Sequence, residues 1–272
     1  LMINLFSLQN KTALITGATG VLGSAMAKGL FNAGAQVILL ARKQEALQRL
    51  AHDISPHGKN ILTVQADVLD EDALVKAKQQ VHQAFGLLDI LVNCAGGNQK
   101  GATILPSQTF FDLDTKAFND VIELNLTGTM LPTKIFGTDI TQKGKGSIIN
   151  ISSLAAFRPL TRVVGYASAK AAISNFTEWL AVELATKYGE GVRVNAIAPG
   201  FFLTEQNREL LTNADGSLTA RGRSIISQTP FKRFGQPEEL VGTLIWLCSD
   251  ASKFVTGTVT LVDGGFNAFS GV

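Results

Sequence analysis

The sequence has 272 residues, of which 46% are hydrophobic, and its 24 basic and 22 acidic residues leave a net charge of +2. This content of apolar side chains is enough for one large core or two small ones. The balanced charge argues against a protein that binds nucleic acid or an anionic membrane. No apolar run reaches the length of a membrane span, and the first residues lack the features of a secretory signal, so we expect a cytoplasmic protein.

Strand-like runs alternate with helical periodicity along the chain. Seven runs are apolar throughout, as is typical of parallel strands buried on both faces; they cover 12–17, 35–41, 61–67, 89–96, 146–153, 193–200 and 256–265. Helical spacing is clear at 21–34, 71–85 and 170–189. We therefore predict an α/β fold of the Rossmann type, with a doubly wound, seven-stranded parallel sheet flanked by helices.

Two segments interrupt this alternation, at 96–114 and 201–237. Each follows the carboxyl end of a predicted strand, where ligands bind in open α/β sheets. We interpret both as substrate loops, and the longer one as a lid.

The stretch TGATGVLG, residues 16–23, joins the first strand to the first helix. Small residues there let the backbone approach a pyrophosphate, and the start of the helix offers free N–H groups. A tight turn without a ligand is the alternative. The cofactor interpretation assigns contacts to Gly17, Thr19, Gly20, Val21, Leu22 and Gly23.

The second strand is followed by Arg42, where a carboxylate would bind the adenosine ribose. An arginine can instead face a 2′-phosphate, so NADP is slightly favoured over NAD. A solvated residue at the start of a helix is the alternative for Arg42.

A set of polar residues follows the sheet. Tyr166 and Lys170 lie four residues apart, on one face of a predicted helix. An ammonium near a phenol lowers the phenol's pKa, which suits Tyr166 for proton transfer to a carbonyl or alcohol oxygen. Ser153 ends the fifth strand and can bind the same oxygen. Asn125 lies in an otherwise apolar helical stretch, either as a satisfied residue at a kink or holding a water that relays protons to Lys170.

Together these motifs resemble the short-chain dehydrogenase/reductase family, in its Tyr-x-x-x-Lys subfamily. The resemblance spans nearly the whole chain and includes TGATGVLG, NCAG, ISS, YASAK, APG and VDGG. It implies a single dinucleotide-binding catalytic domain over residues 1–272, with Tyr166 as general acid–base, Ser153 orienting the substrate, and Lys170 and Asn125 in a proton relay. It also implies cofactor contacts at Asp67, Val68, Asn93, Ala95, Gly96, Tyr166, Lys170, Ile197, Pro199, Gly200 and Thr204.

The glycine loop departs from the family pattern T-G-x-x-x-G-x-G, because Val21 stands where the middle glycine falls. We expect Gly20 to make the close backbone approach instead, with the Val21 side chain directed away from the phosphates.

Longer stretches, among them APGFFLTEQNRELLT and TPFKRFGQPEELVGTLIWLCSD, resemble the D-mannonate oxidoreductase (fructuronate reductase) branch of that family. This implies a small sugar-acid substrate. Arginine can hold a carboxylate bidentately, so the expected substrate contacts are Asn98, Lys100, Ser153, Arg158, Arg162 and Arg208, with Gln99, Glu205, Gln206 and Asn207 beside them. Surface or interface ion pairs are the alternative for the arginines.

Three alternatives compete with this function: a gluconate 5-dehydrogenase, a 3-oxoacyl-carrier reductase, and a dinucleotide-binding regulatory protein without catalysis. The helix from Ala167 to Tyr188 is apolar on more than one face, and the family forms tetramers through it, so we expect a homotetramer. The two cysteines and three histidines show no metal-binding spacing, and we expect no metal, buried unpaired thiols and surface histidines.

Overall fold

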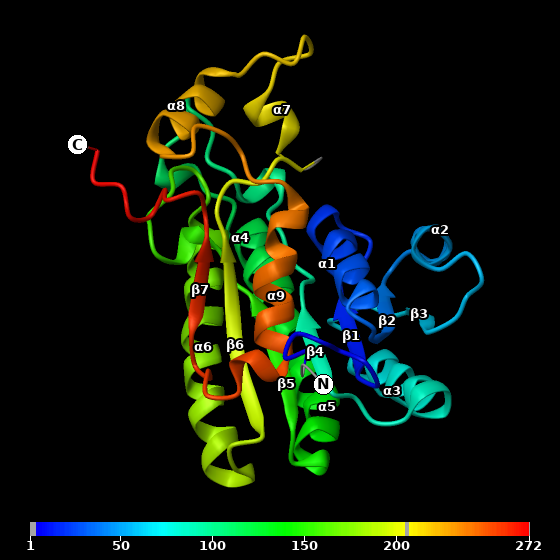
Figure 1. The fold of residues 1–272 in the computed structure, drawn as a ribbon. Coiled ribbons are helices and arrows are strands. Elements are labelled where there is room, and N and C mark those ends of the chain that lie inside the picture. The colour runs from blue at the N-terminus through cyan, green and yellow to red at the C-terminus, as the bar shows by residue number, and fades with distance from the viewer. Residues whose placement is uncertain (1–3, 205–206, 272) are drawn as a thin grey trace.

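The computed structural model describes residues 4–204 and 207–271. Within these ranges, seven strands form one parallel sheet in the order β3-β2-β1-β4-β5-β6-β7 (Figure 1). The strands are β1 (Thr12–Thr16), β2 (Gln36–Ala41), β3 (Ile61–Gln65), β4 (Ile90–Asn93), β5 (Gly146–Ile151), β6 (Val192–Pro199) and β7 (Val259–Val262). The predicted doubly wound α/β fold is confirmed, and each strand overlaps one of the apolar runs.

Helices cover both faces of the sheet because successive strand residues point to opposite sides. Ile15 of β1 contributes to a core shared with α1, α2 and α9, whereas the neighbouring Leu14 contributes to a core shared with α3, α5 and α6. These helices are α1 (Val21–Asn32), α2 (Gln44–Ile54), α3 (Glu71–Phe85), α5 (Gly128–Lys143), α6 (Val164–Tyr188) and α9 (Val241–Cys248).

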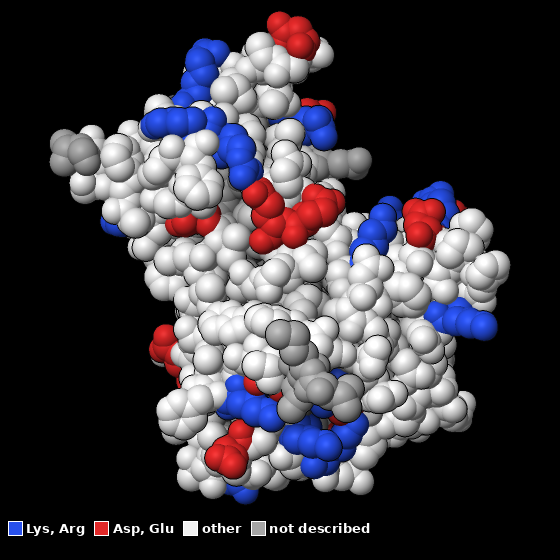
Figure 2. Space-filling model, viewed as in Figure 1, with Lys and Arg blue, Asp and Glu red and all other residues white. Residues whose placement is uncertain are grey.

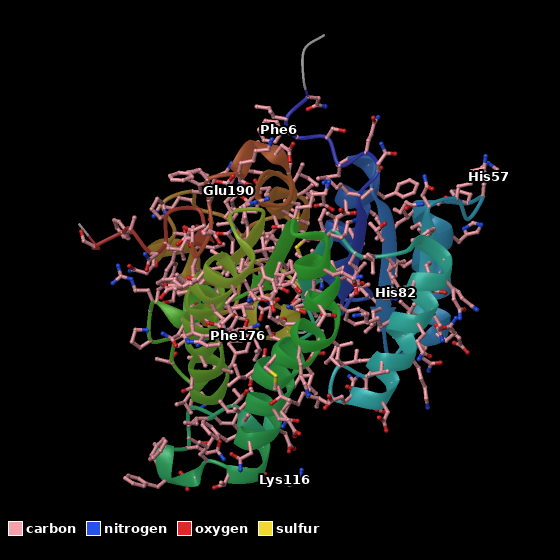
Figure 3. All side chains as sticks on the ribbon, turned by 90° about the horizontal axis from the view of Figure 1, so that it is seen from below. Phe6, His57, His82, Lys116, Phe176 and Glu190 are labelled. Carbon is pink, nitrogen blue, oxygen red and sulfur yellow. The ribbon has the colours of Figure 1, made fainter. Side chains whose placement is uncertain are left out.

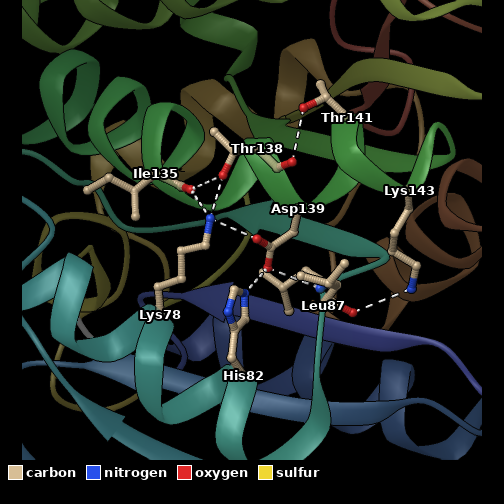
Figure 4. Close-up of polar contacts among 9 residues, drawn as sticks. Lys78, His82, Leu87, Ile135, Thr138, Asp139, Thr141 and Lys143 are labelled. Carbon is tan, nitrogen blue, oxygen red and sulfur yellow. Dashed lines mark hydrogen bonds and ion pairs between the residues drawn. The ribbon is translucent and has the colours of Figure 1, made fainter.

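Buried charge links α3 to α5 on the second face. Asp139 of α5 is 1% exposed, and its carboxylate lies 2.7 Å from Lys78 Nζ and 2.8 Å from His82 Nε2, both on α3 (Figure 4). It also accepts the Leu88 backbone N–H at 3.2 Å. His82 is therefore part of a polar contact between helices, whereas His57 projects from the outer end of the molecule, as expected of a surface histidine (Figure 3).

The two predicted substrate loops contain short helices. The first includes turns at Lys100–Ala102 and Phe110–Asp112 and leads into α4 (Thr115–Ile122). The second carries α7 (Arg208–Leu211) and α8 (Ala220–Gln228), and a short turn at Pro237–Leu240 leads from it into α9. Figure 1 places α7 and α8 beyond the carboxyl ends of the strands.

The base of the second loop is closed by its own backbone. Gly235 N–H donates to Phe201 O at 2.9 Å, and Phe202 pairs with Gly235 in an isolated bridge. A Cβ atom on Gly235 would lie 2.5 Å from the Phe202 ring, so only glycine allows this approach. These contacts between Phe201, Phe202 and Gly235 therefore hold the two ends of the second loop together.

In the described ranges, no helix is long and apolar enough to cross a bilayer. No His, Cys, Asp and Glu side chains of these ranges gather in a group of three that could bind a metal ion. Cys94 and Cys248 are unpaired, and burial raises the pKa of their thiols to about 11 and about 12.

Candidate active site

The loop at residues 16–23 lies where the sheet order reverses. β1 pairs with β2 on one side and with β4 on the other, so the crevice at the carboxyl end of β1 is the expected ligand position in such a sheet. Gly17 has a φ of +63°, and a Cβ there would lie 2.8 Å from Ala95 Cα. A Cβ on Gly23 would lie 2.3 Å from Gly17 O. These two glycines are therefore required by the protein's own turn.

Gly20 has no such requirement. Its φ is −74°, and an added Cβ would meet only Gly17 O, at 3.4 Å. It is the N-cap of α1, and the first helical hydrogen bond is Ser24 N–H to Gly20 O at 2.8 Å, so the Val21 and Leu22 N–H groups precede it. Thr19 and Gly20 are exposed, and Val21 is half-buried. An open glycine at a helix N-terminus fits a bound pyrophosphate.

The loop after β4 faces this turn. Thr16 Oγ1 accepts the backbone N–H groups of Cys94 and Ala95, both at 3.1 Å, and so ties the ends of β1 and β4 together. A Cβ on Gly96 would lie 2.6 Å from Asn125 Oδ1 and 3.3 Å from Lys170 Nζ. Gly96 therefore lets the backbone pass close to two of the expected catalytic side chains.

Asn125 lies in a π-helical segment, Glu123–Thr127, between α4 and α5. Its Nδ2 donates to Gly97 O at 2.7 Å and to Val121 O at 2.8 Å, and its Oδ1 accepts Gly97 N–H at 3.1 Å. The side chain is fully buried. The amide thus holds the Gly97 loop in place at a distortion in the helix, and one lone pair of Oδ1 is left for a further donor.

Tyr166, Ser153 and Lys170 come together at the start of α6. The Ser153 side chain lies near enough to the Tyr166 hydroxyl to act on its pKa, which it lowers. Lys170 Nζ lies 5.5 Å from the centre of the Tyr166 ring and donates to Ile151 O at 2.7 Å. The tyrosine ring packs against Ala102, Ala117 and Val121, so the first loop and α4 form one wall of the site.

Burial dominates the electrostatics of this group. It raises the pKa of Tyr166 above its usual 10.0, although the Ser153 side chain acts in the opposite direction. Burial lowers the pKa of Lys170 to about 8. We expected the ammonium to lower the tyrosine pKa, but Lys170 is not among the groups that shift it, and desolvation of the phenolate is the largest influence.

Two residues that we expected to contact the cofactor have buried side chains that contact the protein itself. Asn93 is 1% exposed and donates to Thr133 Oγ1 at 2.8 Å and to Asn150 Oδ1 at 2.9 Å. Val68 is 5% exposed and packs towards Gly128 of α5. Their backbones border the crevice, but these side chains stabilise the fold.

Arg42, which we expected to face the adenosine part of the cofactor, follows β2, and its side chain is 72% exposed. Its Nη1 lies 4.0 Å from the Asp67 carboxylate, which follows β3. No acidic side chain directly follows β2, and Arg42, although within 4.0 Å of Asp67, remains largely exposed to solvent.

Gly200 directly follows the buried strand β6, which contains Ile197 and Pro199. A Cβ on Gly200 would lie 2.6 Å from Asp263 Cβ, so glycine is required there. Thr204 N–H donates to Asn207 Oδ1 at 2.8 Å, and Asn207 Nδ2 donates to Phe202 O at 2.8 Å. Asn207 thus supports the entry to the second loop. The expected contacts Glu205 and Gln206 lie outside the described residues.

The expected substrate residues separate into two groups. In the first group, Lys100 and Arg208 are exposed. Arg158 donates from Nε to Asn267 Oδ1 at 2.9 Å and from Nη2 to Asn267 O, so it holds the C-terminal segment in place. Asn98 and Arg162 are half-buried. Asn98 Nδ2 donates to Thr103 Oγ1 at 2.9 Å, while its Oδ1 is buried without a partner among the described residues.

Sequence reasoning missed Thr16 as the tie between β1 and β4, and it missed Arg221 of α8, which donates to Thr161 Oγ1 at 3.2 Å. Thr16 could have been found from its place before the glycine turn. Arg221 belongs to no motif.

The family model for short chain dehydrogenases matches residues 11–215. The chain belongs to the short-chain dehydrogenase family. It is therefore an oxidoreductase that acts on a CH–OH group with NAD or NADP.

Among its relatives, an uncharacterized oxidoreductase of Bacillus subtilis is 46% identical, over 98% of each chain. A Haemophilus influenzae protein, described as a candidate D-mannonate oxidoreductase and solved with NAD bound, is 44% identical with a TM-score of 0.91, over 98% of each chain. A gluconate 5-dehydrogenase of Burkholderia cenocepacia, solved with NADP and tartrate, is 30% identical with a TM-score of 0.85, over 97% of this chain and 98% of that one.

Proposed function

We propose that this protein interconverts D-fructuronate and D-mannonate, with Tyr166 as the general acid–base. The observation that carries the proposal is that Ser153 and Lys170 both lie beside Tyr166, with Lys170 Nζ 5.5 Å from the centre of the ring. The glycine loop at residues 16–23 has the turn that a dinucleotide requires. The similarity to the Haemophilus influenzae protein supports the choice of sugar acid.

The nicotinamide cofactor, when bound, supplies the hydride to the keto carbon in the reducing direction. The Tyr166 hydroxyl donates its proton to the keto oxygen as negative charge develops there. The Ser153 hydroxyl binds the same oxygen and holds it within reach of Tyr166. Lys170, with its pKa near 8, exchanges protons readily near neutral pH, and Asn125 Oδ1 retains a lone pair that can accept a water beside it.

The substrate loops favour a polyhydroxylated acid. The unpartnered Asn98 Oδ1 is a buried acceptor that a sugar hydroxyl would satisfy. D-Fructuronate is the 5-keto form of D-mannonate, and the related gluconate 5-dehydrogenase is named for carbon 5 of a stereoisomeric acid. The position of the ketone relative to the carboxylate is therefore common to both reactions, and the configuration of the hydroxyls distinguishes them.

The test is Tyr166→Phe, assayed by NADH and NADPH oxidation with D-fructuronate, 5-keto-D-gluconate and an acetoacetyl thioester. We expect turnover of D-fructuronate by the unmodified chain, and a loss of kcat/KM of about 100-fold or more in the variant, since general acid–base catalysis contributes at least that much. Cofactor affinity should fall much less than kcat/KM, because the variant removes only the hydroxyl of Tyr166 and keeps its ring. Tyr188→Phe is the matched control, because Tyr188 is half exposed at the far end of α6.

Turnover of the thioester alone would contradict the sugar-acid proposal, and turnover of 5-keto-D-gluconate alone would favour a gluconate 5-dehydrogenase. Activity of Tyr166→Phe within about tenfold of the unmodified chain would contradict the role of Tyr166. The same assay addresses the cofactor: we propose a preference for NADP from the exposed Arg42, and equal or better use of NADH would contradict it.

A further inference from the structure

The two substrate loops meet at the segment before α6. From the first loop, Ile104 N–H donates to Arg162 O at 3.0 Å. From the second, Arg221 Nη1 donates to Thr161 Oγ1 at 3.2 Å. Tyr166 follows Arg162 by four residues, and it packs against the apolar cluster that contains Ala102 of the first loop. The reacting centre and both loops are thus connected through residues 161–166.

Arg162 has an unusual backbone conformation. Its φ is +76°, a region that side chains other than glycine rarely adopt. The hydrogen bond from Ile104 to its carbonyl holds it there. Strained residues of this kind cluster at ligand clamps and active sites, where the surrounding structure maintains them for the position they give to a side chain.

Two arginines meet at this segment without an acidic partner among the described residues, because Arg221 bonds Thr161, the residue before Arg162. Neither Arg162 nor Arg221 forms an ion pair with any carboxylate in the described ranges. Both are half-buried. Burial lowers the pKa of Arg221, and the charge of Arg162 lowers it further. Partly buried like charges are costly unless an anion lies between them.

The other basic groups of this end of the molecule are exposed or engaged. Figure 2 shows basic side chains gathered at the upper end, where Figure 1 places α7 and α8. Arg233 pairs with Glu239, Arg158 is bound to Asn267, and Arg223 donates to Leu218 O. Arg162 and Arg221 differ from these because both are half-buried and neither forms an ion pair among the described residues.

We propose that Arg162 and Arg221 together bind the carboxylate of the substrate, with Arg221 carried to it by α8. This rests on the proposed sugar-acid function and identifies which residues recognise the acid. A guanidinium presents two parallel N–H groups to a carboxylate, so two of them can satisfy all of its lone pairs. Asn98 lies on the same loop as Ile104, so the hydroxyls of the sugar would extend from the carboxylate past Asn98 towards Tyr166.

The test uses Arg221→Gln and Arg162→Gln with paired substrates that differ only in charge. D-Fructose has the skeleton of D-fructuronate with a hydroxymethyl group in place of the carboxylate. We expect each variant to raise the KM for D-fructuronate by about 10- to 100-fold, the effect of a charged hydrogen bond. The low kcat/KM for D-fructose should change by less than about threefold. Arg221→Lys retains the positive charge but not the two parallel N–H groups. Its KM for D-fructuronate should lie between those of the unmodified chain and of Arg221→Gln.

Arg223→Gln is the matched control, since Arg223 is exposed on the same helix and should leave both substrates unchanged. Equal losses for D-fructuronate and D-fructose in Arg221→Gln would mean that α8 is simply misplaced, and would overturn the proposal. An unchanged KM for D-fructuronate would also overturn it.

A second readout separates this proposal from the proposed function. If no keto acid is turned over, the proposed function fails, and the carboxylate site is judged by calorimetric titration with D-mannonate and with D-mannitol, its uncharged analogue. Binding of D-mannonate that is lost in Arg221→Gln supports the site. Equal affinity of the unmodified chain for both compounds, or no binding of either, overturns it.

Discussion

A substitution at Gly20 can separate an effect on ligand binding from an effect on folding. Its φ is allowed for any residue, and a Cβ there meets only one atom, at 3.4 Å. We predict that Gly20→Ala leaves the free energy of unfolding within about 0.5 kcal/mol of the unmodified chain, yet weakens NADH and NADPH binding at least tenfold, because the methyl group enters the space of the pyrophosphate. Fluorescence titration and urea unfolding measure the two effects.

Gly23→Ala is the contrasting variant, because its Cβ would lie 2.3 Å from Gly17 O. It should lose stability as well as binding. Gly242→Ala, in α9 with no atom within 4 Å of the added Cβ, should leave binding unchanged and should not lower stability, since alanine favours a helix more than glycine does. Unchanged dinucleotide affinity in Gly20→Ala would show that the phosphates do not approach this glycine.

The sequence permits some site residues to be predicted and not others. Tyr166 and Lys170 are four residues apart on a helix, so their proximity follows from helical geometry. Ser153 lies two residues beyond the end of β5, at the edge of the sheet where ligands usually bind. Arg221 could not be found, because an isolated arginine in a long irregular loop has neither periodicity nor a motif. Its position depends on how α8 folds back over Thr161.

At the level of elements, strands were predictable because their apolar runs are unbroken, but their ends were not. The run at 89–96 gives a strand of only Ile90–Asn93, because pairing with β1 stops at Thr16. The π-helical segment at Glu123–Thr127 was also missed, apart from the suggestion that Asn125 marks a kink. Such a distortion depends on the bonds between Asn125 and Gly97, which are 28 residues apart.

The contact between α3 and α5 offers a test of buried charge. Removing the charge of Asp139 leaves Lys78 and His82 without their shared partner. Breaking a buried pair costs about 3–5 kcal/mol. For Asp139→Asn we expect a loss of about 3 kcal/mol in the free energy of unfolding, at the lower end because both partners remain partly exposed to water. Urea unfolding at fixed protein concentration measures it.

Asp120→Asn is the control, since Asp120 pairs with Lys116 on the surface of α4, where a pair contributes under about 1 kcal/mol. Activity of the folded Asp139→Asn enzyme should be normal. A loss no greater than that of Asp120→Asn would mean that the α3–α5 contact does not depend on this charge.

For the whole molecule, we propose the homotetramer that the family resemblance implies, assembled through α6. The inner face of this helix is buried by Ile173, Leu180 and Ala181, yet Trp179 is 59% exposed and Val182 is 69% exposed on its outer face. A groove between α5 and α6 is lined by Met130, Phe176, Leu184 and Tyr188 together with polar side chains such as Lys134 and Thr138. Large exposed apolar side chains on one helix are typical of an association site, and they support this proposal.

Light scattering after size exclusion should give four chains for the unmodified protein. We expect Val182→Glu to shift the population to smaller species, because a charge would be buried without a partner in the interface. Val75→Glu, at an exposed apolar residue of α3, should leave the assembly unchanged. Two results would exclude this face of α6 as the interface. One is a monomeric unmodified chain, and the other is a tetramer that Val182→Glu disturbs no more than Val75→Glu does. In both cases the carboxylate introduced at position 182 would be in contact with water.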